Sequence, residues 1–136
     1  MREILFRGKR VSDGKWVEGC YCKQYNSEPP HARDGIMHER LDGMVDYSTT
    51  EVARETIGQY IGLCDKNGKK IFEGDIMPVW EGGEKYLYKV IYCGDCFMLS
   101  MLDSEQGSYP LSVKHSISEI IGNIHDNPEL MKGEQK

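Results

Sequence analysis

The side chains best suited to chemistry in this 136-residue chain are its five cysteines and four histidines. Cys93 and Cys96 enclose Gly94-Asp95 as a CxxC, a spacing used by zinc half-sites and by redox dithiols. A structural zinc needs two more ligands, and Cys20 and Cys22 would offer them only as a CxC on one strand face. A redox dithiol needs a helix N-terminus, whereas this motif spans an expected hairpin turn. We interpret these cysteines as thiols beside a turn and expect no bound metal.

The histidines suggest a second chemistry. His31 and His38 lie in a polar stretch with Asp34, Glu39 and Asp42, residue types that bind metals or exchange protons. Their spacing matches no metal-binding pattern, and the composition of the stretch alone accounts for them. The sequence therefore predicts no catalytic residue and no cofactor. A small metal-dependent enzyme working through this stretch is kept as an alternative.

Tyrosines mark the clearest expected strand, 85–92. Tyr86, Tyr88 and Tyr92 alternate along it and share one face. Such a stripe stacks on bases, forms a subunit interface, or packs half-buried against a core. We take the three tyrosines as candidate binding residues.

Two amide side chains complete the set of candidate binding residues. Gln59 follows Gly58 and Asn123 follows Gly122, each within an expected strand. If these two strands lie side by side, they close the sheet; chance explains the repeated pattern equally well. Gln59 is the residue of its segment with no obvious structural duty.

The charge balance limits the partners. Seventeen basic against 22 acidic residues give a net charge of −5, which disfavours general nucleic-acid binding. The first fifteen residues are nevertheless net positive, so a nucleic-acid-associated factor using this basic hairpin is an alternative. No apolar run approaches the roughly 20 residues of a membrane span, and no secretory segment is apparent. With an odd number of cysteines, we expect a cytoplasmic protein that has no contact with a membrane.

Short strands joined by tight turns organise the chain. We expect tight turns that reverse the chain direction at Asp13-Gly14, Asn67-Gly68 and Gly74-Asp75. We expect a polar loop or insertion over 26–43, a helical turn beginning at Asn127-Pro128, and a frayed tail over 132–136. For 44–52 a strand is favoured over a short helix at 50–55. The expected strands are 4–8, 16–22, 57–63, 69–72, 76–80, 85–92, 97–102, 109–113 and 119–124.

This pattern has no alternation of strands and helices, and it predicts a mainly β fold, a small barrel or sandwich. Pro78 places the strand 76–80 at a sheet edge, because proline cannot donate to a neighbouring strand. A closed barrel would remove other exposed edges.

The chain also resembles a known family. The segment from Glu55 to Ile76, with its Ile-Gly-Gln-Tyr, Asp-Lys-Asn-Gly-Lys and Phe-Glu-Gly-Asp-Ile runs, is similar to the central motif of the YopX family. Arg2–Gly8 and the segments Glu119–Ile124 and Asn127–Leu130 resemble the two ends of that family. Ile61 and Cys64 depart from it, standing where a small hydroxyl residue and a charged residue are usual.

The resemblance implies a protein encoded by a bacteriophage or prophage, with a small SH3-like barrel carrying additional strands and hairpins. It supplies no catalytic residues and no substrate. We expect one YopX-like domain over 1–136, acting as a non-enzymatic accessory protein that binds or assembles. The expected partners are a second copy, in a homo-oligomer, and an unknown host or phage protein.

Overall fold

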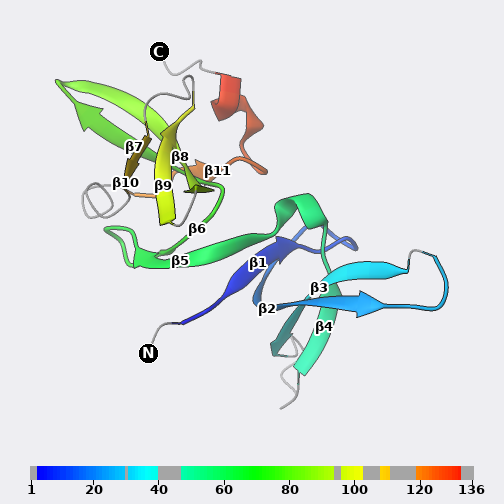
Figure 1. Cartoon of the computed structure of the whole chain (residues 1–136). Helices are drawn as coiled ribbons and strands as arrows, with labels where there is room; N and C mark the ends of the chain where they lie inside the picture. The colour runs from blue at the N-terminus through cyan, green and yellow to red at the C-terminus, as the bar shows by residue number, and fades with distance from the viewer. Residues whose placement is uncertain are drawn as a thin grey trace. The chain divides into compact units, whose positions relative to one another are not determined.

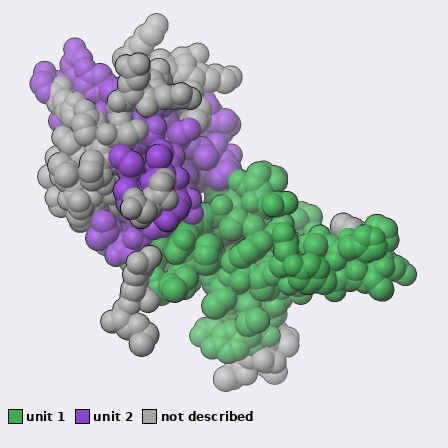
Figure 2. All heavy atoms as spheres, viewed as in Figure 1, with its two compact units in different colours: residues 1–60 green, residues 61–136 purple. Residues whose placement is uncertain are grey.

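The computed structural model describes residues 3–29, 31–39, 47–93, 96–102, 108–110 and 119–132. The chain forms two compact units, residues 1–60 and 61–136 (Figure 2). Antiparallel strands dominate both units, with short 3-10 turns at Arg54–Thr56 and Pro128–Lys132 (Figure 1). The mainly β class is therefore confirmed, while a single domain over 1–136 stays a prediction. The tail expected to fray lies outside the described residues, apart from Lys132.

The first unit is built on long hairpins. Its core contains Val17, Ile36 and Val52, with Phe6 and Ile57 packed against them. The six-stranded sheet has the order β4-β3-β2-β1-β5-β6, and β5 passes from the first unit into the second at residue 61. Its strands are β1 (Phe6–Lys9), β2 (Trp16–Tyr25), β3 (Ala32–Glu39), β4 (Tyr47–Glu51), β5 (Gly58–Cys64) and β6 (Lys70–Phe72).

The expectation of a polar loop over 26–43 is wrong for its central part. Strand β3 pairs with β2 on one side and with β4 on the other, and Ile36 within it is fully buried. The strand forms because its neighbours satisfy its backbone on both sides, although its own sequence is mostly polar. Residues 47–51 form the strand favoured for this region, and 44–46 lie outside the described residues.

The second unit holds the other sheet, in the order β10-β9-β8-β7-β11. Its core comprises Ile71, Met77, Val79, Tyr88, Val90 and Leu99. The expectation that strand 76–80 is a sheet edge is wrong, because β7 lies between β8 and β11. The described pairing with β11 is limited to Asp75 and Ile76, whereas Pro78 pairs with Leu87 of β8. The strands are β7 (Asp75–Glu81), β8 (Glu84–Cys93), β9 (Cys96–Met101), β10 (Ser108–Pro110) and β11 (Gly122–Asn123).

Neither sheet closes on itself across the described ranges, so the SH3-like barrel is not confirmed. The last strand is also shorter than expected, because residues 119–121 are irregular and only Gly122–Asn123 pair. The expected strand 109–113 is seen as β10 at 108–110, and its remainder lies outside the described residues. The helical turn expected at Asn127-Pro128 is confirmed by the 3-10 turn.

Candidate functional site

The sheet of the first unit has one face turned away from its core, which we call the outer face. Strand register places Lys9 opposite Trp16, Cys20 opposite Met37, and Glu39 opposite Tyr47. These residues alternate with the core residues Val17 and Ile36, and so lie on the other side of the sheet. We define the outer face by Lys9, Trp16, Cys20, Met37 and Tyr47.

The outer face carries large exposed side chains among charged residues such as Glu18 and Glu39. Met37 is 43% exposed and Tyr47 is 66% exposed. The register puts Met37 opposite Thr49, two residues from Tyr47, so the two large side chains are diagonal neighbours. Tyr47 opens β4, the edge strand of this sheet. An edge strand that carries an exposed aromatic residue offers two kinds of contact to a partner protein. Its backbone can hydrogen-bond to a strand of the partner, and its aromatic side chain can anchor in the partner's surface.

The basic hairpin is engaged internally. The Arg7 guanidinium lies 4.4 Å from the centre of the Trp16 ring, and the Lys9 ammonium lies 5.5 Å from it. Arg7 is only 9% exposed, so it supports the indole ring more than it presents charge to solvent. Arg10 forms an ion pair with Asp13 at 3.4 Å. These contacts engage Arg7, Lys9 and the Nε side of Arg10, whereas the Lys15 ammonium has no acidic partner among the described residues.

The three candidate tyrosines of β8 have different environments. Tyr88 is completely buried in the core of the second unit, and Tyr86 packs partly against that core. The Tyr86 hydroxyl donates a 2.6 Å hydrogen bond to Glu84. Tyr92 is 55% exposed and meets Phe97 edge to face, with 5.1 Å between ring centres. Of the three, Tyr92 is the most accessible to a partner, and Tyr88 is inaccessible while the unit is folded.

The two candidate amides are not brought together by strand pairing. Gln59 lies on β5 opposite Phe6 of β1, whereas Asn123 lies on β11 beside β7. The idea that their strands pair and close the sheet is therefore wrong. Asn123 also has a structural duty, since its Oδ1 accepts hydrogen bonds from the backbone N–H groups of His125 and Asp126. It holds the turn after β11.

The cysteines and histidines do not converge. Cys93 and Cys96 are register partners at the end of the β8–β9 hairpin, and all five cysteines are thiols. Both ring nitrogens of His38 are bonded within the first unit, Nδ1 to the Glu39 carbonyl and Nε2 to the Thr50 hydroxyl. In the described part of the chain no three or more His, Cys, Asp or Glu residues form a group able to hold a metal. His115 lies outside that part.

One tyrosine on the core side of the same sheet is electrostatically perturbed. The Tyr21 hydroxyl donates a 2.5 Å hydrogen bond to Asp34 Oδ1, which also lies 3.6 Å from the Lys23 ammonium. The bond to Asp34 raises the pKa of Tyr21, because ionisation would set two negative charges side by side. Tyr21 is thus held as a neutral donor linking β2 to β3.

Sequence reasoning missed Met37 and Tyr47 as surface residues. Met37 lay within the stretch assigned to a loop, and Tyr47 at an uncertain strand start. The available signal was the alternation of Ile36 and His38, both buried, with exposed Met37 and Glu39. That signal covers four residues, too few to outweigh the polar composition around it.

Comparison with known proteins supports a family and a fold. A family model described as YopX protein matches residues 5–132. The crystal structure of protein EF1440 from Enterococcus faecalis is similar, with a TM-score of 0.54 and 21% identity over 97% of this chain and 100% of that one. No curated protein matches the chain. No described helix has the length and apolar character needed to cross a membrane.

Proposed function

The chain belongs to the YopX family, and we propose that it is a non-enzymatic accessory protein of a phage or prophage that works by binding proteins through the outer face. The observation that carries this proposal is the pair Met37 and Tyr47, two large exposed side chains that are diagonal neighbours at a sheet edge. Exposed aromatic and methionine side chains are typical of protein interfaces.

The edge strand gives the proposal its mechanism. On the side away from β3, the Glu51 carbonyl already accepts a hydrogen bond from the Val11 N–H at 3.0 Å, so an added strand would pair along the part of β4 that begins at Tyr47. Tyr47 and Met37 would provide the side-chain contact there. Backbone hydrogen bonds would supply much of the affinity and the aromatic anchor would select the partner. Trp16, held by Arg7 and Lys9, extends this contact surface across β2.

A second copy of the chain is the first partner that we propose. Two β4 strands paired antiparallel across a twofold axis would satisfy both edges at once, which is the usual geometry of a symmetric dimer. A host or phage protein that adds a strand would then compete with this homo-oligomer. The bacterial cytoplasm suits both, because it keeps five thiols reduced.

Sedimentation velocity over a wide concentration range tests the homo-oligomer. Tyr47→Glu places a charge on the outer face, and Tyr25→Glu is the matched control, since Tyr25 is 77% exposed but alternates onto the opposite face of β2. We expect wild type and Tyr25→Glu to associate as concentration rises, and Tyr47→Glu to stay monomeric. A wild-type protein that stays monomeric throughout would contradict the homo-oligomer.

A further inference from the structure

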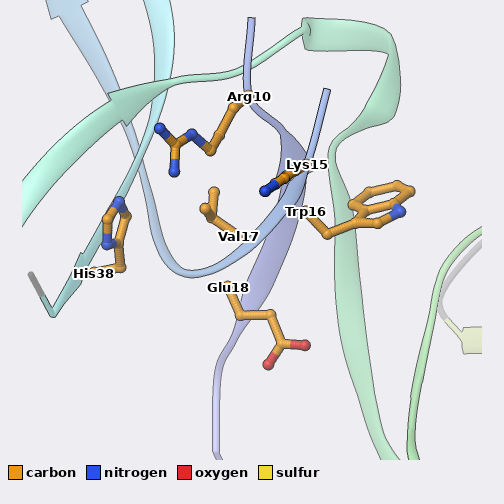
Figure 3. A pocket seen from close by; sticks show the side chains of 6 residues that line it. All are labelled: Arg10, Lys15, Trp16, Val17, Glu18 and His38. Atoms are coloured by element: carbon orange, nitrogen blue, oxygen red, sulfur yellow. The ribbon is translucent and has the colours of Figure 1, made fainter. Parts of the chain in front are cut away.

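A pocket of about 340 Å³ lies in the first unit, where β3 separates from β2 (Figure 3). Pairing of β2 with β3 runs from Cys20 to Tyr25, whereas Trp16–Gly19 pair with β1. The opening between the two strands is lined by Arg10, Lys15, Trp16, Val17, Glu18 and His38. Its volume is near the lower end of the range for small-molecule sites.

The lining residues divide by the direction of their side chains. Figure 3 shows Arg10, Val17 and His38 on one side of β2, with the Trp16 ring and the Glu18 carboxylate directed away from them. Val17 is 6% exposed and provides an apolar wall. His38 forms a second wall, since both of its ring nitrogens are already bonded to Glu39 and Thr50. The Glu18 carboxylate therefore does not oppose an anion in the pocket.

Two cations have donors to spare at this pocket. The Nε of Arg10 lies 3.4 Å from Oδ1 of Asp13. The two Nη groups of Arg10 make no hydrogen bond to any described residue. The Lys15 ammonium likewise has no acidic partner in the described ranges; its backbone N–H donates to Asp13 at 3.0 Å. Two positive charges and the single Asp13 carboxylate leave one positive charge in excess. An arginine fork and an ammonium that line one pocket can both donate to the oxygens of a carboxylate.

We propose that this pocket binds a small carboxylate that carries a branched aliphatic group. The excess of one positive charge matches a monoanion, whereas a phosphate dianion or a nucleotide would carry more negative charge than Arg10 and Lys15 balance beside Asp13. The Val17 wall matches the aliphatic group. The same chemistry is available from a free short-chain acid or from the C-terminal residue of a peptide. Because the pocket opens on the side of β2 opposite the outer face, this inference does not depend on the proposed protein-binding function.

Titration of the full chain, followed by amide NMR shifts, tests the pocket with 3-methylbutanoate and its uncharged amide as probes. We expect saturable shifts at residues 15–18 with the acid, and at least about tenfold weaker binding of the amide, because the charge-assisted bonds are lost. Arg10→Gln and Lys15→Gln should each weaken acid binding by about tenfold, while Lys66→Gln, an exposed lysine of the second unit, should leave it unchanged.

A second titration, with peptides, tells whether the ligand is a free small acid or the C-terminal residue of a peptide. An acetylated peptide ending in a valine carboxylate should bind if the site takes chain ends, and its amidated form should not; binding of the free acid alone assigns the site to small acids. Equal binding of the acid and its amide would overturn the proposal. An unchanged affinity of Lys15→Gln for the acid would also overturn it, because this surface substitution leaves the fold intact. Tighter binding of inorganic phosphate than of the acid would overturn it as well. Tyr47→Glu should bind the acid normally, which keeps this test separate from that of the outer face.

Discussion

The carboxylate of Asp65 accepts a 3.0 Å hydrogen bond from the backbone N–H of Ile120, a residue 55 positions later in the chain. The same carboxylate accepts from the N–H groups of Asn67 and Lys69 at 2.9 Å. Asp65 therefore forms the turn between β5 and β6 and also ties it to the segment before β11. Only 6% of Asp65 is exposed, so these three donors depend on it.

Asp65 should make stability depend on acid pH. Burial raises its pKa, but the hydrogen bonds from Ile120, Lys69 and Asn67 outweigh burial and lower it overall. A carboxyl with a lowered folded-state pKa stabilises the fold fully above its unfolded pKa of about 3.9, and this stability is lost as pH falls through the folded pKa. Urea unfolding of wild type should show this loss below about pH 4.

Asp65→Asn should remove part of that acid dependence. At neutral pH it should cost about 1–3 kcal/mol, because an amide cannot accept from all three donors and a buried N–H is left unpaired. Glu28→Gln, an exposed carboxylate in the β2–β3 turn, is the control and should change stability little. An Asp65→Asn protein with wild-type stability at pH 7 would contradict this role.

Gly19 should tolerate no side chain. A Cβ there would overlap the backbone carbonyl of Met37, where β3 crosses close to β2. Gly19→Asn should therefore destabilise the fold by roughly 1–3 kcal/mol, since backbone must move. Gly14→Asn is the matched control: Gly14 has φ +73° with nothing within 4 Å, and asparagine tolerates that conformation. Equal unfolding midpoints for the two variants would argue against the close crossing.

Ile36→Ala tests whether β3 is ordered in solution. Ile36 is fully buried in the core of the first unit, so its truncation should cost about 2–5 kcal/mol in urea unfolding. A residue in a surface loop would lose almost nothing. Met37→Ala, next to it on the exposed face, is expected to cost under about 1 kcal/mol. If both variants lost similarly little unfolding free energy, residues 32–39 would be better described as a surface loop than as strand β3.

The turns were predictable from the sequence because their chemistry is local. Asp65 and Gly68 form the expected β5–β6 turn, whose side-chain bonds reach two and four residues ahead. Strand β3 was not predictable, because pairing on both sides decides its structure and Ile36 is its one buried aliphatic residue. The outer face depends on the register of four strands, β1 to β4, which no single segment of the sequence encodes. Tyr88 is a similar case. The alternation along its strand predicted which face of the sheet it lies on, but not that it would be completely buried.

The basic hairpin should not bind nucleic acid appreciably. Arg7 is buried against Trp16, so Lys9, Lys15 and the Nη groups of Arg10 are the described cations of the hairpin that could meet phosphates, fewer than tight nucleic-acid binding uses. Fluorescence anisotropy with labelled single-stranded and duplex oligonucleotides at low salt should show no binding at micromolar protein. Saturable binding that Lys9→Glu abolishes would instead favour the nucleic-acid alternative.

Hydrogen exchange of the backbone amides of β4 tests most directly the claim that the outer face and its edge strand form the contact surface. The comparison is between dilute and concentrated protein, with the β7–β8 hairpin, which carries the 61% exposed Trp80, as the internal control. We predict that exchange at residues 47–51 slows with concentration in wild type but not in Tyr47→Glu, while the hairpin stays unchanged. Exchange at β4 that is independent of concentration, or slowing confined to the β7–β8 hairpin, would contradict the account.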